Sequence, residues 1–282
     1  MKTIEYWAAR FAIATVALCP PLARVYLKLI ELAIPRLRRT AVRNLEIAGI
    51  PDDAVIDGTF LSIARTLGTF ARFPRINREN IHRLIRYDGL DNFKTAAARG
   101  HGVLVATAHF GNWELSAFAH ALMTAPMHVV VRPLDNPRVD AMVEQRRALS
   151  GNHIISKREA AREILRALKN GDAVGILIDQ NTAADEGVFV DFFGTPACAN
   201  SGFVKLAHHS DAAVVPGYAL WSGTEKKYVL RFDPEIPMTG DVQADTQRIH
   251  SHLESVIRRH ADQYLWIHRR WKTRPPGESP LY

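Results

Sequence analysis

The stretch VLVATAHFGNWEL, residues 103–115, carries a short apolar run into a histidine and then into a polar turn. Small and β-branched residues over 102–108 predict a buried strand, because such runs are short and are bounded by turn residues. Gly111 permits a sharp change of direction, and Asn112 is a favoured N-cap for the helical pattern WELSAFAHAL that follows. The stretch therefore predicts a strand, a tight turn and a helix, with His109 at the carboxyl end of the strand.

The same alternation continues along the chain. Four more apolar runs predict strands at 127–133, 152–156, 173–180 and 212–220. The spacing of apolar residues predicts helices at 112–122, 138–149, 158–170 and 201–210. Strands that alternate with helices need crossover connections, which favour a largely parallel central sheet with helices on both faces. The sequence thus predicts an α/β fold in which Asp179, like His109, ends a strand, where functional groups of such folds collect.

The first 94 residues lack this alternation and predict a helical layer. Within them, 51–73 has the spacing of an amphipathic helix. We expect residues 1–94 to form an N-terminal helical, membrane-associating region and residues 95–282 to form an α/β domain. No internal repeat or low-complexity linker separates them, so we expect one continuous domain overall.

Membrane association is predicted because apolar helices lie beside clustered arginines. The apolar run 11–23 is shorter than the roughly 20 residues that span a bilayer, and Pro20 and Pro21 interrupt it. In 24–43, apolar side chains share one helical face and arginines crowd its end: Val25, Leu29, Leu32 and Ala33, then Arg36, Arg38, Arg39 and Arg43. This composition is typical of a helix on an anionic membrane surface. A helical hairpin packed on the domain, with a solvated basic face, explains it equally well.

Composition narrows the class of partner. A formal net charge of +7 over 282 residues attracts anions, such as nucleic acid, phosphorylated lipid, an acidic carrier protein or phosphate-bearing substrates. Cys19 and Cys198 lie far apart and form no CxxC, so we expect no disulfide framework, no metal site and a reducing compartment. Because the arginines cluster towards the two ends beside apolar residues, nucleic acid is not an expected partner.

His109 and Glu114 form the candidate catalytic pair. On a continuous helix a spacing of five would place them about 140° apart, but across the predicted turn they can meet. Glu114 falls in the first helical turn, where its charge is favoured. A carboxylate on one imidazole nitrogen leaves the other free to accept a proton. The alternative, a lone histidine that satisfies a buried hydrogen bond, is common, but the strand-end position favours a general base.

No Ser stands in a G-x-S-x-G elbow, and Cys198 has no histidine beside it in sequence. We therefore expect the base to deprotonate a substrate hydroxyl, which then attacks an acyl carbon. The backbone amides around Asn112 and Trp113, at a helix N-terminus, or a nearby arginine, are candidates to stabilise the resulting oxyanion. The same pair acting on water would make the protein a thioesterase-type hydrolase.

HFGNWE resembles the H-x4-D/E motif of the lysophospholipid acyltransferase superfamily, in the glutamate form of the late lipid A biosynthesis (lauroyl/myristoyl) acyltransferases. Further stretches carry the resemblance along most of the chain: RRTAVRNLEIAG (38–49), VVVRPLDNP (129–137), AREILRALKNGDAVGILIDQN (161–181), FVDFFGTPA (189–197) and QYLWIHRRWKTRP (263–275). Their common order and spacing make the resemblance fairly specific.

The resemblance implies residue roles. It makes His109 the general base and Glu114 its acidic partner. It assigns importance to an arginine on the helix after the R-P-x-x-N-P segment, here Arg147 with Arg146 adjacent, and to the strand-end Asp179. We expect five residues to bind substrate: Arg147, Asp179, Arg146, Asn112 and, in the VRP segment, Arg132.

The implied reaction moves a fatty acyl group from acyl carrier protein or coenzyme A to a hydroxyl of a membrane glycolipid, such as a lipid A precursor. It would take place at the cytoplasmic face of the inner membrane, with a peripheral or monotopic enzyme and no metal or other cofactor. After FFGTPA the family often has threonine and proline before its glycine, whereas this chain has CANSG. That departure leaves the acceptor and acyl-chain length open, and related members acylate other lipids, such as mannosylated phosphatidylinositol.

The segment 263–275 interleaves aromatic and basic residues. Membrane interfaces favour this composition, so we expect the segment to contact phosphate headgroups. The alternative is that its tryptophans pack inside the domain and its arginines face solvent.

Overall fold

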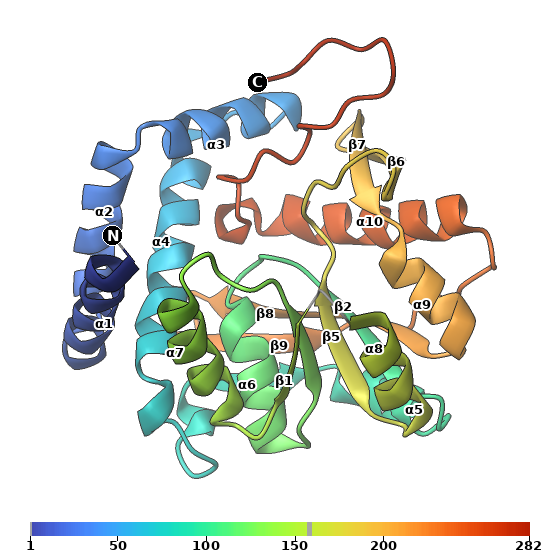
Figure 1. The fold of residues 1–282 in the computed structure, drawn as a ribbon, viewed down its shortest axis with the longest axis horizontal. Coiled ribbons are helices and arrows are strands. Elements are labelled where there is room, and N and C mark those ends of the chain that lie inside the picture. Colours follow the sequence, from blue (N-terminus) through green and yellow to red (C-terminus); the bar gives the residue numbers. More distant parts are fainter. Residues whose placement is uncertain (1, 157–159) are drawn as a thin grey trace.

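A computed structural model describes residues 2–156 and 160–282. Its centre is a seven-stranded sheet in the order β1-β9-β8-β2-β5-β3-β4 (Figure 1). The strands are β1 (Ile85–Asp88), β2 (Val103–Thr107), β3 (His128–Val131), β4 (His153–Ser156), β5 (Ala173–Leu177), β8 (Ala213–Ser222) and β9 (Lys227–Phe232). All neighbours pair in parallel except β8 and β9. The predicted largely parallel α/β sheet is confirmed.

Four helices around the sheet match those predicted from the alternation: α6 (Trp113–Met123), α7 (Pro137–Ala148), α8 (Ala160–Lys169) and α9 (Gly202–Ser210). Two more, α5 (Leu90–Ala97) and α10 (Val242–Arg259), also pack on the sheet. The start of the helix predicted at 158–170 lies outside the described residues. Successive residues of β2 face opposite sides: Leu104 and Ala106 pack in the core formed with α8, α9 and α10. Val103 and Val105 pack in the core formed with α5 and α6.

The described part of the N-terminal region begins with four helices, α1 (Lys2–Leu18), α2 (Leu22–Ala33), α3 (Arg36–Ile47) and α4 (Asp53–Ala71). Figure 1 shows α1 and α2 beside α4 at one side of the molecule, and α1, α2 and α3 all contact α4. No helix in the described part of the chain is long and apolar enough to cross a bilayer.

Three features depart from the predicted pattern. Strand β1 belongs to the region predicted to be wholly helical, and it forms one edge of the main sheet beside β9. Strand β9 was not predicted from its sequence. The segment that includes FVDFFGTPA forms a separate antiparallel hairpin, β6 (Gly187–Phe192) and β7 (Thr195–Asn200). The antiparallel return from β8 to β9 and the parallel edge strand β1 are pairings between strands, which single-strand patterns do not encode.

The turn after β2 has the predicted geometry. Gly111 has a φ of +61°, and a Cβ atom there would lie 2.1 Å from the Ala219 carbonyl oxygen. The Asn112 side chain caps α6 by accepting a hydrogen bond from the Leu115 amide at 3.0 Å. Only glycine fits this turn, because the left-handed conformation and the close backbone approach both exclude a side chain.

Candidate active site

The candidate site lies at the carboxyl ends of three neighbouring strands. His109 follows β2, Asp179 follows β5 and Arg132 follows β3, and β2, β5 and β3 are adjacent in the sheet. The pairing of β2 with β5 continues past the strands, because the Ile178 amide donates to the Thr107 carbonyl oxygen at 2.9 Å. Parallel register thus brings His109 beside Asp179 although they are far apart in sequence.

His109 pairs with Asp179. The His109 Nδ1 atom lies 3.0 Å from Asp179 Oδ1, and the Asp179 side chain is only 3% exposed. Glu114 was expected in this position from the sequence. Within residues 2–156 and 160–282, Asp179 is instead the carboxylate hydrogen-bonded to the imidazole, which corrects that expectation. The reason is geometric. The ends of the adjacent strands β2 and β5 lie side by side, whereas Glu114 lies on α6, beyond the turn.

Glu114 instead holds Arg147. Its carboxylate accepts two hydrogen bonds from the guanidinium, from Nε at 2.9 Å and from Nη2 at 2.6 Å. The pair is largely buried, with side-chain exposures of 14% for Glu114 and 24% for Arg147. Bidentate pairs of this kind are strong and fix orientation. The sequence singled out both residues, and the structure places them together, close enough to His109 for both charges to influence its pKa.

Charge balances burial at His109. Burial disfavours the protonated imidazole, but the Asp179 carboxylate outweighs it, so the pKa of His109 lies above its ordinary value. Burial likewise opposes ionisation of Asp179, and the neighbouring imidazole overcomes it, which lowers the pKa of that carboxyl. The pair therefore favours an ionised Asp179 that stabilises a protonated His109, the state that forms when the histidine accepts a proton.

The predicted oxyanion donors need correction. The Asn112 amide donates to the Ala219 carbonyl oxygen at 2.8 Å, and Asn112 is fully buried. Its amide is therefore occupied, and its side chain serves as the α6 cap rather than as a substrate ligand. The Trp113 and Glu114 amides are in the first turn of α6, where no carbonyl four residues earlier in the helix exists to accept from them.

The other predicted arginines occupy different environments. Arg132 is exposed just after the end of β3. Arg146 is partly buried, and its Nε atom has no hydrogen-bond partner among the described residues. Burial lowers the pKa of Arg146. Both remain candidates for contact with an anionic substrate, and neither forms part of the His109–Asp179 pair.

The C-terminal segment holds the strand ends in place. The Leu265 amide donates to the His109 carbonyl oxygen at 3.0 Å, and the Gly111 amide donates to the Gln263 carbonyl oxygen at 2.9 Å. His268 Nε2 accepts from the Asn181 amide at 3.1 Å, two residues after Asp179. Residues 263–268 therefore bond to the loops that carry both members of the pair. Sequence reasoning missed this function because the bonds are mostly from the backbone.

The tryptophans expected to contact headgroups from the same segment are buried instead. Trp266 and Trp271 are 1% and 0% exposed, and Arg270 is 2% exposed. Arg270 donates to the Cys198 carbonyl oxygen at 2.7 Å and lies over the Phe192 ring. The alternative of tryptophans packed inside the domain is correct, although Arg270 is buried with them. Within the described residues no cluster of three or more metal-ligating side chains occurs.

Comparison with known proteins identifies the family. The sequence model of the bacterial lipid A biosynthesis acyltransferases matches residues 4–273. The chain belongs to this family. It is thereby classed among the acyltransferases, as the resemblance of HFGNWE predicted.

Three named relatives show the range of similarity to this acyltransferase. It is 25% identical to a lipid A biosynthesis acyltransferase of Haemophilus influenzae over 80% of this chain and 71% of the relative. It is 35% identical to the lipid A biosynthesis palmitoleoyltransferase of Escherichia coli K12 over 69% of this chain and 64% of the relative. It is 24% identical to the lipid A biosynthesis myristoyltransferase of the same organism over 99% of this chain and 91% of the relative.

Proposed function

We propose that this protein transfers a fatty acyl group from an acyl thioester, carried by acyl carrier protein or coenzyme A, to a hydroxyl of a lipid A precursor. The observation that carries the proposal is the His109–Asp179 pair at the strand ends of a chain that belongs to the lipid A acyltransferase family. The relatives differ in the acyl group that their names specify, so no chain length is assigned.

His109 acts as the general base in this proposal. Asp179 holds Nδ1, which leaves Nε2 to take the proton of the acceptor hydroxyl. The acceptor oxygen then attacks the thioester carbon, and the carbonyl becomes an oxyanion. When the carbon–sulfur bond breaks, the thiolate leaves and receives the proton from His109. The protonated intermediate is the state that the Asp179 carboxylate stabilises.

Arg147 supplies positive charge beside this reaction. Glu114 fixes the guanidinium through Nε and Nη2, and the Arg147 charge influences the pKa of His109. We assign Arg147, together with the first-turn amides of Trp113 and Glu114, to stabilising the oxyanion or the phosphates of the substrates. In this assignment Glu114 is a positioning residue for Arg147.

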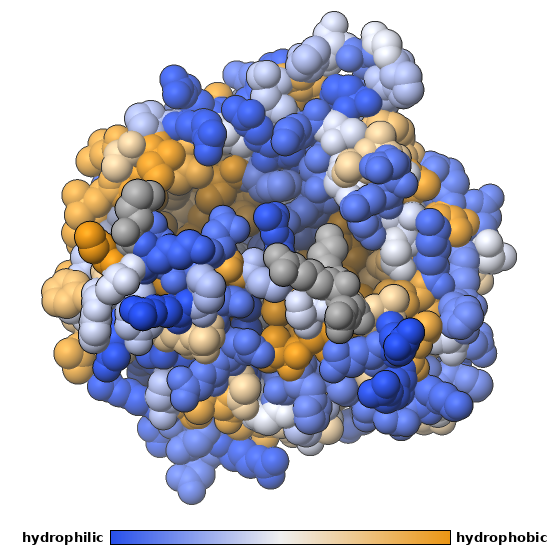
Figure 2. Space-filling view, in the orientation of Figure 1, coloured by the Kyte–Doolittle hydropathy of each residue, from blue (hydrophilic) through white to orange (hydrophobic). Residues whose placement is uncertain are grey.

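The acceptor is membrane-embedded, and one surface of the protein suits a membrane. Large apolar side chains are exposed along α1 and α2: Ile4, Trp7, Phe11, Leu18, Val25, Leu29, Ile30 and Leu32. Figure 2 shows apolar side chains gathered on the side of the molecule where these helices lie. A contiguous apolar surface of this kind marks an interaction site. We assign it to peripheral or monotopic association with the cytoplasmic face of the inner membrane.

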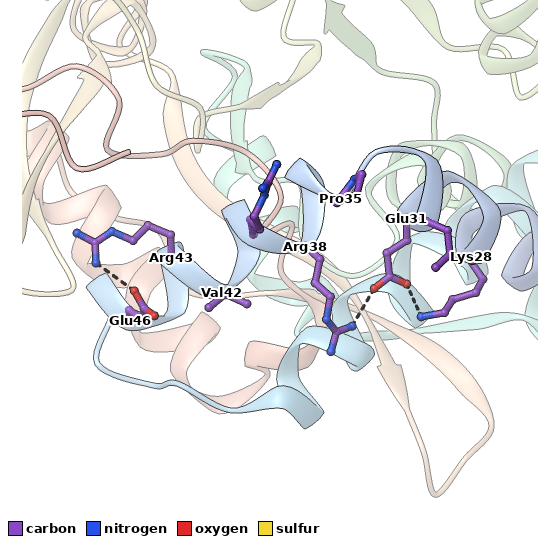
Figure 3. A pocket seen from close by; sticks show the side chains of 9 residues that line it. Lys28, Glu31, Pro35, Arg38, Val42, Arg43 and Glu46 are labelled. Atoms are coloured by element: carbon purple, nitrogen blue, oxygen red, sulfur yellow. Dashed lines mark hydrogen bonds and ion pairs between the residues drawn. The ribbon is translucent and has the colours of Figure 1, made fainter.

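The bend between α2 and α3 adds a basic hollow to this surface. It has a volume of about 560 Å³, and Lys28, Arg38, Arg39 and Arg43 outnumber Glu31 and Glu46 in its lining. Figure 3 shows Glu31 between Lys28 and Arg38, with which it forms ion pairs at 2.9 Å. None of the candidate catalytic residues lines this hollow. Its basic lining beside exposed Leu32 suits anionic headgroups rather than the acyl transfer itself.

The reaction is tested with two donors, acyl carrier protein and coenzyme A, each carrying a labelled acyl group as a thioester. They are supplied to a panel of lipid acceptors with either wild type or His109→Ala. We expect labelled lipid A precursor from wild type and a loss of about 10² to 10⁴ in rate from the variant. Labelled free fatty acid alone would identify a hydrolase. Labelling of another glycolipid, such as mannosylated phosphatidylinositol, would keep the chemistry and change the acceptor.

Membrane association is tested by co-sedimentation with phosphatidylglycerol vesicles. The double variant Trp7→Ser, Phe11→Ser removes two exposed rings of α1. Burial of a large apolar side chain contributes about 1.5–3 kcal/mol, so we expect vesicle affinity to fall at least about 100-fold. Leu149→Ser, which removes an equally exposed side chain at the end of α7, is the matched control and should bind as wild type does. Equal loss in both variants would contradict the assignment of α1 to the membrane.

A further inference from the structure

Helix α7 carries Arg147 but is weakly anchored in the domain. None of its twelve residues is buried. Its last turn is tied to α6 by the Arg147–Glu114 pair. The inward face of α7 is only half-buried, with Val143 packed against the core. Because apolar burial is the main force that fixes a helix on a domain, the bonds at the two ends of α7 add substantially to what holds it. The bonds at its amino end therefore bear on where Arg147 lies.

At that end Asn136 bonds in two directions. Its Oδ1 atom caps α7 by accepting from the Arg138 and Val139 amides at 3.1 and 3.4 Å. Its Nδ2 atom donates to the Lys2 carbonyl oxygen at 2.7 Å and to the Glu5 carboxylate at 3.0 Å. Asn136 is 7% exposed. One buried side chain thus joins the first turn of α1 to the first turn of α7.

We propose that Asn136 is a positioning residue that couples the docking of α1 to the placement of α7, and through α7 to the Arg147–Glu114 pair beside His109. The two ends of the side-chain amide have different partners: Oδ1 caps α7, and Nδ2 donates to α1. An aspartate keeps the first function, because aspartate and asparagine cap helices equally well. It loses the second, because it has no donor and would face the Glu5 carboxylate at hydrogen-bond distance.

The coupling gives α1 a second function. In the membrane association proposed above, on which this step rests, α1 inserts exposed rings at the lipid surface. When α1 is bound to lipid, its bond to α7 would fix the position of α7 and of Arg147 beside His109. The active site would therefore be best ordered when the enzyme is on the membrane that contains its substrate. Asn136 makes the hydrogen bonds that link α1 to α7 in this way.

The test separates the two functions of Asn136 by charge. Asn136→Asp should lower kcat between about 10- and 100-fold, the range expected when a catalytic group is misplaced by about 1 Å. Glu5→Gln alone keeps an acceptor for Nδ2 and should have little effect. The double variant Asn136→Asp, Glu5→Gln reverses the direction of the bond to residue 5 but leaves the Lys2 carbonyl oxygen without its donor, so it should recover part of the lost kcat. Asp135→Asn, at the neighbouring exposed position, is the matched control. It exchanges the same two residue types in the same loop and should leave kcat unchanged.

Hydrogen–deuterium exchange of residues 137–148 is measured in the same variants, and it needs no enzymatic turnover. Exchange in the last turn of α7 should be faster in Asn136→Asp and move back towards the wild-type rate in the double variant. If wild type transferred no acyl group, the proposed function would fail while this exchange experiment still tested the coupling. Unchanged kcat in Asn136→Asp, unchanged exchange, or a loss that Glu5→Gln does not lessen would each overturn the proposal.

Discussion

Replacing Asp179 by asparagine tests the central pair of the site with the least change in shape. The new amide side chain still offers an oxygen to His109 Nδ1, so the imidazole keeps its hydrogen bond but loses the charge that stabilises its protonated form. In wild type that charge acts at a contact of 3.0 Å from a carboxylate that is 3% exposed. Charges about 4 Å apart attract by about 4 kcal/mol at an effective dielectric constant of about 20, which corresponds to about 10³-fold in rate. We therefore expect kcat/KM to fall by about 10³.

The pH profile of the same variant provides an independent measurement. His109 must be neutral to accept a proton, so activity rises with pH as the histidine deprotonates. Because Asp179 raises the pKa of His109, the acid limb of wild type should lie above the pH expected for an ordinary histidine. In Asp179→Asn burial is no longer outweighed by that carboxylate, so the pKa falls and the acid limb should move to lower pH.

The assay is steady-state transfer of a labelled acyl group across the pH range in which the protein stays folded. Asp172→Asn is the matched control. Asp172 lies just before β5, whereas Asp179 lies just after it. The Asp172 carboxylate is 3.3 Å from His128 Nε2, at the amino ends of the strands and away from the candidate site. It should leave rate and profile unchanged. If Asp179→Asn lost less than about tenfold and kept the wild-type limb while Glu114→Gln moved it, Glu114 would be the partner of the imidazole and our assignment would be refuted.

Three other substitutions have outcomes that follow from single contacts. Arg147→Lys keeps the charge but not the two-point contact with Glu114, so kcat should fall at least about tenfold, and adding Glu114→Gln should cost little more in a double-mutant cycle; full additivity would show that the two act separately. Asn44→Ala removes a buried side chain that donates to the Trp266 and His268 carbonyl oxygens at 2.5 and 2.6 Å, and the free energy of unfolding in urea should fall by about 2–4 kcal/mol. Trp271→Ala should cost about 3–5 kcal/mol of stability while the folded protein keeps its vesicle affinity, and a loss of affinity at full stability would return Trp271 to the membrane surface.

The fold was predictable where a pattern is local. Period and boundary residues placed β2, β5 and the helices between the predicted strands, and parallel pairing followed from the alternation of strands with helices. Strand β1 and the return through β9 were not predicted, because their place in the sheet depends on which strands pair. A short strand such as Ile85–Asp88 carries too few residues to be distinguished from its helical surroundings.

The site was predictable as a set of residues but not as a set of contacts. His109, Glu114, Arg147 and Asp179 were all selected from the sequence, and the structure divides them into two pairs. Proximity in sequence favoured Glu114 as the partner of His109, whereas the adjacency of β2 and β5 brings Asp179 there. Nearness along the chain is a poor guide at the end of a parallel sheet, where neighbours in space come from different crossover units.

Composition was least informative at 263–268. Aromatic and basic residues suit both a membrane interface and a buried segment that saturates its hydrogen bonds, and burial decides between them. The Leu265 and Gln263 backbone groups that hold the strand ends carry no mark in the sequence, because any residue other than proline supplies the same amide and carbonyl.

Those backbone bonds also determine when the enzyme can first work. The strand ends that bear His109 and Asp179 are made earlier in translation than the segment that fixes them, residues 263–268, which comes near the end of these 282 residues. Domains fold as units as the chain emerges from the ribosome, so a nascent chain presents an incomplete site until that segment has been released. The site is therefore completed only after the strand ends that bear it have been made.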